Sequence, residues 1–185
     1  MATLKWIGRA KATAQVDSIT PGGTIGTETF TIRVGDSSNG RTVTYTAESG
    51  NTAAEVVDGL VAAWNADANP EIAEITAADA STYLTLTADT EGKPFTVTAT
   101  ATGSATLTRA AVTANSSPND ANDGDNYDTG SVPVNSDVVV FENSDIDVLW
   151  NLDSLSGVTL TSLRRKASYT GTIGLPAENE AGYTE

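Results

Sequence analysis

Runs of alternating polar and apolar residues constrain the fold of this chain more than any other feature of its sequence. Such runs occur before residue 113 in the ranges 29–34, 41–46, 71–77, 83–88, 94–101 and 105–112. Alternation with a period of two places one set of side chains on each face of a β-strand. The chain also contains 29 threonines among its 185 residues, and β-branched residues favour strands. We therefore expect a mainly β protein, and the composition disfavours an all-α fold.

One segment carries helical periodicity instead. Thr52 and Glu55 match a capping box, in which each side chain satisfies a backbone N–H group at the start of a helix. The apolar residues that follow recur at helical spacing: Val56, Val57, Leu60, Val61 and Trp64. The segment 65–70 ends in proline and is expected to terminate the helix. Because such a helix cannot bury its apolar stripe alone, we expect residues 12–113 to form an α+β domain, an antiparallel sheet with one packed helix.

The composition changes between residues 115 and 130. This segment has almost no apolar residues, and we interpret 114–130 as an acidic linker. Its closely spaced oxygens are of the type that calcium takes, which makes weak calcium candidates of Asp120, Asn122, Asp123, Asp125 and Asp128. The spacing differs from that of an EF-hand, because Ser131 stands where the loop requires a bidentate glutamate. The pattern favours a solvated linker, and we expect no metal and no cofactor.

Short β-forming bursts follow the linker, in the ranges 137–141, 146–150, 157–163 and 168–173. No hairpin dipeptide such as Asn-Gly joins them, so near-parallel strands closed by short turns are favoured. Residues 131–185 therefore predict a short β-solenoid-like domain, with a β-sandwich-like half as the alternative. A solenoid this short exposes its last coil, which would need a cover from another subunit.

The residue types present argue against catalysis and against several classes of partner. The sequence contains no His and no Cys, so it lacks imidazole bases, thiolate nucleophiles and the usual zinc ligands. We therefore expect a protein that is not an enzyme. The net charge of -14 disfavours nucleic acid and anionic membranes as partners. A polysaccharide hydrolase is the remaining enzymatic alternative, with a carboxylate pair drawn from Glu142, Asp145, Asp147 and Asp153.

The first eleven residues reverse the overall charge. Lys5, Arg9 and Lys11 precede the first acidic residue of the chain and flank Trp6 and Ile7. We interpret residues 1–11 as an N-terminal arm that docks on an acidic partner through these five side chains. A first strand with solvated ends is the alternative. The opening residues contain no continuous apolar signal segment, so we expect the chain to be made in the cytoplasm.

Two parts of the sequence resemble structural proteins of tailed bacteriophages. The ranges 42–66 and 84–98, with Gly50-Asn51-Thr52-Ala53 and Gly92-Lys93-Pro94-Phe95 among them, resemble a module that recurs in those proteins. The ranges 130–140 and 170–176 are similar to β-solenoid proteins of phage heads and fibres. Both resemblances rest on patterns of apolar and glycine positions, and neither transfers a catalytic residue.

The resemblance implies a virion component, either a capsid decoration (cement) protein or a head-fibre protein. Such a protein would be made in the host cytoplasm, bind the major capsid protein on the exterior of the shell and stabilise it. The resemblance also implies self-association, as a homotrimer. The alternative is a receptor-binding tail spike or adhesin that contacts polysaccharide on the host surface.

Overall fold

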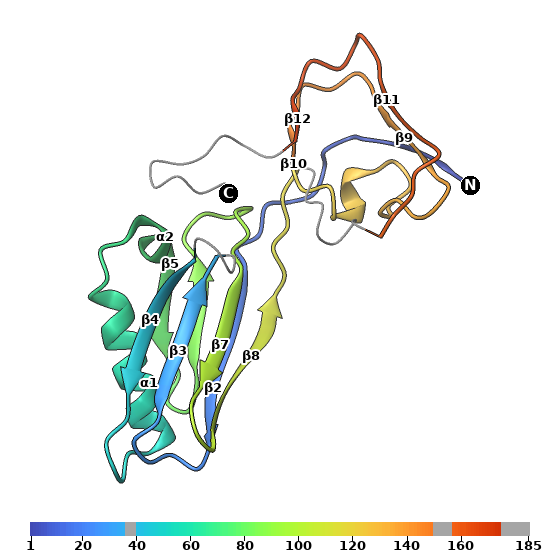
Figure 1. The fold of residues 1–185 in the computed structure, drawn as a ribbon. Coiled ribbons are helices and arrows are strands. Elements are labelled where there is room, and N and C mark those ends of the chain that lie inside the picture. Colours follow the sequence, from blue (N-terminus) through green and yellow to red (C-terminus); the bar gives the residue numbers. More distant parts are fainter. Residues whose placement is uncertain (36–39, 150–156, 175–185) are drawn as a thin grey trace. The chain divides into compact units, whose positions relative to one another are not determined.

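The structure is a computed structural model that describes residues 1–35, 40–149 and 157–174 (Figure 1). The chain divides into two compact units. Unit 1 contains Met1–Thr13 and Ser116–Glu185, and unit 2 contains Ala14–Asn115. Unit 2 is therefore an insertion in the chain of unit 1. The segments 1–11 and 114–130, which we expected to be an arm and a linker, fall almost entirely within unit 1.

The described residues of unit 2 form two antiparallel sheets and one long helix. One sheet has the order β5-β6-β2-β8, with strands at Ile75–Asp79, Leu84–Ala88, Val16–Gly23 and Ala105–Thr113. The other has the order β4-β3-β7, with strands at Arg41–Thr46, Thr29–Val34 and Val97–Ala101. The predicted pairing of 29–34 with 41–46 is present, and residues 36–39 between them lie outside the described residues. The expected mainly β class, with antiparallel strands and one packed helix, is confirmed.

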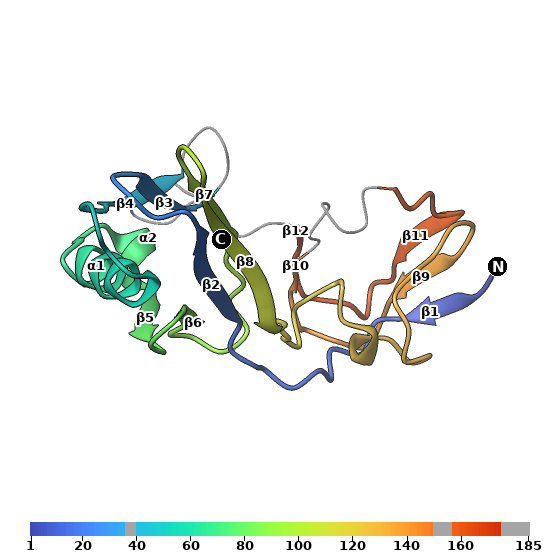
Figure 2. The same ribbon diagram turned by 90° about the horizontal axis from the view of Figure 1, so that it is seen from below.

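Helix α1, Ala53–Asn65, begins at the predicted capping box. The Glu55 N–H donates to Thr52 Oγ1 at 3.3 Å, and the Thr52 N–H donates to Glu55 Oε2 at 2.7 Å. The buried side of the helix consists of Val56, Val57, Leu60 and Trp64. Trp64 Nε1 donates to the Ile75 carbonyl at 2.7 Å, which ties the helix to β5. Figure 2 shows α1 next to β4 and β5. The helix therefore packs on both sheets, and residues of both contribute to one hydrophobic core.

A single helical turn, α2 at Pro70–Ala73, occupies the start of the range in which we expected a strand. The Asn69 side chain caps it by accepting from the Glu71 N–H at 3.1 Å, and the proline sits at the start of the helix, where its missing N–H costs nothing. Strand β5 then begins at Ile75. Within the described ranges, neither helix has the length and apolar content needed to cross a bilayer.

The described residues of unit 1 contain two short parallel ladders. Strands β1 (Thr3–Lys5), β9 (Val138–Phe141) and β11 (Ser162–Arg165) form a sheet with the order β1-β9-β11. Strands β10 (Val148–Leu149) and β12 (Ile173–Gly174) form a second pair, and Asp120 adds a parallel bridge to Leu149. The first pass of the chain consists of β1 and the segment around Asp120, the second contains β9 and β10, and the third contains β11 and β12. Both ladders stack these three passes in the same order.

The second and third passes of unit 1 are separated by nearly the same interval in both ladders. Val138 pairs with Ser162 and Val148 pairs with Ile173, which are separations of 24 and 25 residues. Stacked coils produce this pattern of parallel pairing, whereas β-sandwiches are antiparallel. The strands in the described part of unit 1 close no barrel, and their extent does not establish a solenoid, which stays a prediction.

Aromatic rings form the centre of unit 1. The Trp6 ring centroid lies 5.4 Å from that of Tyr127 and 6.0 Å from that of Phe141, and the Phe141 centroid lies 5.4 Å from that of Tyr169. Each tyrosine hydroxyl donates to a carbonyl, of Ala121 at 3.0 Å for Tyr127 and of Ile146 at 2.8 Å for Tyr169. Burial raises the pKa of the Tyr127 hydroxyl. These rings join residues from the first, second and third passes into one core.

Helix α1 packs closely against the sheet at Gly59. A Cβ at this position would overlap the ring of Tyr45, and a 3.1 Å hydrogen bond between the Tyr45 hydroxyl and Asn51 Oδ1 holds that ring in place. Alanine is favoured over glycine in a helix by about 1 kcal/mol. We nevertheless expect Gly59→Ala to lower the free energy of unfolding by about 1–3 kcal/mol because of the overlap, as measured by urea denaturation.

Tyr45→Ala supplies the matched background for this test. Once the ring is removed, Gly59→Ala should be neutral or stabilising. An equal loss in both backgrounds would show that the ring does not limit the size of residue 59.

Candidate functional site

The expected N-terminal arm is an integral strand of unit 1. Leu4 pairs with Val139 in the parallel β1–β9 ladder, and Trp6 forms an antiparallel bridge with Tyr127. Trp6 is 1% exposed, and its indole packs on the rings of the aromatic core. The aromatic anchor of a docking arm is therefore not on the surface, because Trp6 completes the core of its own unit.

The residues after Trp6 alternate between buried and exposed positions. Ile7 is half-buried, and its N–H donates to the Asn126 carbonyl at 2.8 Å. Ala10 is buried, while Arg9 and Lys11 on either side of it are exposed. Neither cation forms an ion pair with a described residue. Arg9 and Lys11 are thus solvent-facing cations on a segment held in place by its neighbours.

The acidic segment is a folded loop and not the solvated linker that we expected. Asn126, which is fully buried, organises it. Its Oδ1 accepts from the Ala10 N–H at 2.9 Å, and its Nδ2 donates to the carbonyls of Ser117 at 2.6 Å and Asp120 at 2.8 Å. The amide supplies one acceptor and two N–H donors at once, which neither a hydroxyl nor a carboxylate can do. The polar residues of the segment therefore satisfy backbone groups within unit 1, which explains a fold with so little apolar content.

Three of the five calcium candidates make contacts of the same kind. Three aspartates accept from backbone N–H groups: Asp120 from Asn122 at 2.9 Å, Asp123 from Asp125 at 3.0 Å and Asp128 from Lys5 at 2.8 Å. The bonds of Asp120 and Asp123 span two residues and shape turns, whereas that of Asp128 joins the segment to β1. In the described residues no group of three or more acidic, His or Cys side chains lies close enough together to hold a metal ion.

Glu142 connects the three strands of the β1-β9-β11 sheet at one end. It follows β9 and forms ion pairs with Lys5 of β1, at 2.8 Å, and with Lys166, directly after β11. These two ammonium groups lower the pKa of the Glu142 carboxyl to about 2, with the Lys166 contact contributing most. Glu142 also raises the pKa of the Lys5 ammonium. Lys5, Glu142 and Lys166 therefore link the three strands through two ion pairs. We call this arrangement the Glu142 clamp.

The carboxylates named for a polysaccharide hydrolase have other partners in the structure. Glu142 is held between its two lysines. Asp147 Oδ1 accepts from the Thr172 N–H at 2.7 Å, which joins β10 to the next pass of the chain. Asp153 lies outside the described residues. No described contact brings these acids together as a pair.

Strand β11 forms an open edge of unit 1. It pairs with β9 on one side, and no strand among the described residues lies on the other side. Leu163 occupies the same column as Leu4 and Val139, which are 2% and 0% exposed, yet Leu163 itself is 45% exposed. Arg164 and Arg165 are also exposed. The edge thus combines an uncovered apolar side chain with positive charge.

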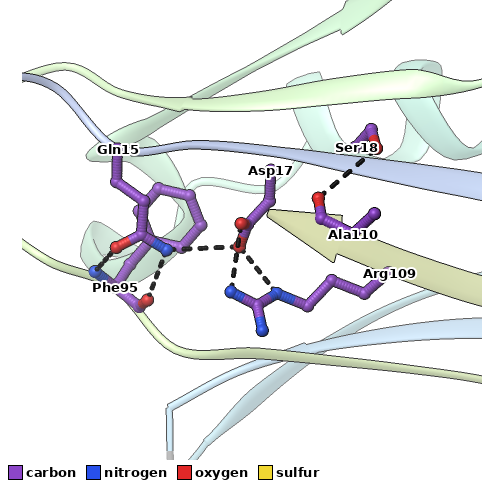
Figure 3. Close-up of polar contacts among 6 residues, drawn as sticks. All are labelled: Gln15, Asp17, Ser18, Phe95, Arg109 and Ala110. Carbon is purple, nitrogen blue, oxygen red and sulfur yellow. Dashed lines mark hydrogen bonds and ion pairs between the residues drawn. The ribbon is translucent and has the colours of Figure 1, made fainter. Parts of the chain in front are cut away.

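An ion pair between a buried aspartate and a partly exposed arginine in unit 2 was not predicted from the sequence. Asp17 on β2 is fully buried, and its two oxygens accept from Arg109 Nε at 2.8 Å and Nη2 at 3.0 Å (Figure 3). Gln15 Nε2 also donates to Asp17, at 3.2 Å, and to the Phe95 carbonyl at 2.8 Å. Both carboxylate oxygens are therefore engaged, and Asp17 ties β2 to β8. Gln15 ties β2 to the segment before β7.

The sheet pairing is irregular next to this ion pair. Val16 pairs with Thr113 and Asp17 pairs with Ala111, so Val112 has no residue opposite it. Val112 is accordingly 61% exposed. A bulge of this kind twists an edge strand and makes further pairing on it less favourable. The edge at β8 is therefore protected in a way that the edge at β11 is not.

Comparison with known proteins adds no identification. No protein-family model matches the chain, and no curated protein matches it. The functional interpretation therefore rests on the residues themselves.

Asn126 provides a test of the folded acidic loop. Asn126→Ala leaves the Ala10 N–H and the two carbonyls without partners, so we expect it to reduce the free energy of unfolding of unit 1 by about 3 kcal/mol. Asn122→Ala is the control, because Asn122 Oδ1 has no hydrogen-bond partner in the structure. Chemical denaturation measures both, and equal losses would contradict a special role for Asn126.

The Glu142 clamp predicts a dependence of stability on pH. Because the folded-state pKa of Glu142 is depressed to about 2 from an ordinary value of 4.5, its contribution is present above about pH 4.5 and is lost as the pH falls towards 2. Glu142→Gln should therefore destabilise the protein at pH 7, and its melting temperature should approach that of the wild type at pH 2. Glu91→Gln, at an exposed turn of unit 2, should show no such convergence.

Proposed function

We propose that the chain is a non-enzymatic structural protein of a bacteriophage particle, which binds the outer surface of the capsid and reinforces it. In this proposal the protein is made in the host cytoplasm and reaches the virion by binding the major capsid protein. The sequence resemblance to phage head proteins supports the proposal, together with a mainly β structure.

The observation that carries the proposal is the pair of exposed cations at Arg9 and Lys11. They project from a segment that is fixed by the buried Gly8 and Ala10, in a chain with a net charge of -14. A fixed segment loses little conformational entropy when it binds, and positive charge on an otherwise acidic protein selects both the orientation and an acidic partner. The shell contact is therefore an ordered basic surface of unit 1 and does not require a free arm.

The proposed shell contact contains fewer residues than the one expected from the sequence. Of the five residues Lys5, Trp6, Ile7, Arg9 and Lys11, we now assign the direct contact to Arg9 and Lys11. Trp6 holds the segment from within the core, and Lys5 is engaged by Glu142. Deletion of residues 1–11 would remove strand β1 and is not a clean test.

Charge reversal tests the contact without removing the strand. Arg9→Glu combined with Lys11→Glu should leave the melting temperature unchanged within about 2 °C, because both side chains are exposed. The same variant should lose at least about tenfold in affinity for capsids stripped of this protein, as measured by co-sedimentation. Arg41→Glu combined with Lys93→Glu changes the net charge equally in unit 2 and should bind as the wild type does. Equal binding by all three proteins would refute the assignment.

The location of the protein on the particle is the broader test. Electron cryomicroscopy of particles from the phage that encodes this chain should place it on the exterior of the head. A position at the tail tip would favour the receptor-binding alternative, and its absence from the particle would overturn the proposal.

A further inference from the structure

The two edges of the β1-β9-β11 sheet differ in a way that points to a partner. At the β1 edge, the Lys5 N–H donates to Asp128 Oδ1 at 2.8 Å, and the Lys5 carbonyl accepts from the Asp128 N–H at 2.9 Å. Trp6 pairs with Tyr127 just beyond. The segment 126–128 therefore covers this edge at Lys5 and Trp6 and satisfies both backbone groups of Lys5. At the β11 edge no described residue does so.

The two edges also carry opposite charge. The cover of the β1 edge presents Asp125 and Asp128, which are both exposed. The β11 edge presents Arg164 and Arg165, also exposed, at the end of a strand whose Leu163 is 45% uncovered. Figure 2 shows β1 and β11 on opposite sides of β9, so the acidic and basic surfaces lie at opposite ends of one stack.

We propose that unit 1 associates head to tail, with the β11 edge of one copy receiving the Asp125–Asp128 surface of a second copy. Arg164 and Arg165 pair with the two aspartates, and the contact covers Leu163. A second copy fits this edge because it brings the complementary charge on a surface that is already folded. This contact is independent of the shell attachment proposed above, since it uses neither Arg9 nor Lys11.

The charge pattern also disfavours the symmetric alternative. Two β11 edges placed against each other would bring together four arginines on two copies of the same surface, and like charges at an interface oppose association. A head-to-tail contact is heterologous, so it closes into a ring or continues as a chain of subunits. The homotrimer expected from the phage resemblance would be the closed form of such a contact.

Charge-swap variants of the full chain test the interface. The basic-end variant is Arg164→Glu with Arg165→Glu. The acidic-end variant is Asp125→Lys with Asp128→Asn, in which the asparagine keeps an acceptor for the Lys5 N–H. Sedimentation velocity at low salt should show the wild type as an assembly, and each variant alone should dissociate at a concentration at least about tenfold higher. Added salt should weaken the wild-type assembly.

An equimolar mixture of the two variants tests whether the contact is head to tail. Each contact between unlike variants again joins opposite charges, so association should return as open assemblies or even-numbered rings, whereas a closed ring of three would keep one contact between like variants. Arg9→Glu with Lys11→Glu, which changes the net charge as much as the basic-end variant does, should assemble as the wild type does even where it fails to bind capsids. A monomeric wild type, an acidic-end variant that assembles normally, or a mixture that stays dissociated would each overturn the proposal. Near-ultraviolet circular dichroism confirms that every variant is folded.

Discussion

The parallel pairing of Thr3–Lys5 with Val138–Val140 is the contact on which the organisation of this protein depends. It joins residues at 135 positions apart, and it encloses the whole of unit 2 between its two strands. The entropy lost on closing a loop grows slowly with length, and a folded insert shortens the effective loop further. Val16 pairs with Thr113 and Thr13 bridges Ser116, so the two ends of the insert lie together. Unit 1 therefore accommodates an insertion of about a hundred residues, and the entropy lost on joining its two segments is that of closing a short loop.

Local patterns predicted the parts of the fold that local interactions determine. The capping box at Thr52 and the apolar stripe to Trp64 predicted α1, and alternation predicted β3 and β4 with their observed bounds. Strand β2 escaped prediction because its buried face carries Asp17, Ile19 and Pro21. A buried aspartate breaks the apolar alternation, and its carboxylate is stabilised by Arg109, 92 residues later, together with Gln15. Pro21 is tolerated because β2 has a neighbour on one side only at that point.

The candidate site was less predictable, because its residues depend on partners far away in the sequence. A stretch such as Lys5-Trp6-Ile7 has the same local pattern in a free arm and in a strand, and its partner strand begins at Val138. The polar segment around Asn126 has the composition of a linker, yet its side chains replace the hydrogen bonds that a regular element would supply. Glu142 likewise gains its role only when the passes of the chain stack and bring two lysines to it.

The discontinuity of unit 1 imposes an order of events on a growing chain. Strand β1 leaves the ribosome first, but the strand that it pairs with follows about 135 residues later, a delay of roughly 7–30 s at ordinary rates of translation. All of unit 2 emerges within that interval and has the contacts it needs to fold. Leu4 and Trp6 meanwhile stay without their core. The nascent protein thus passes through a stage in which unit 2 can fold while the apolar side chains of β1 are still exposed. At this stage a chaperone or a neighbouring chain has access to β1.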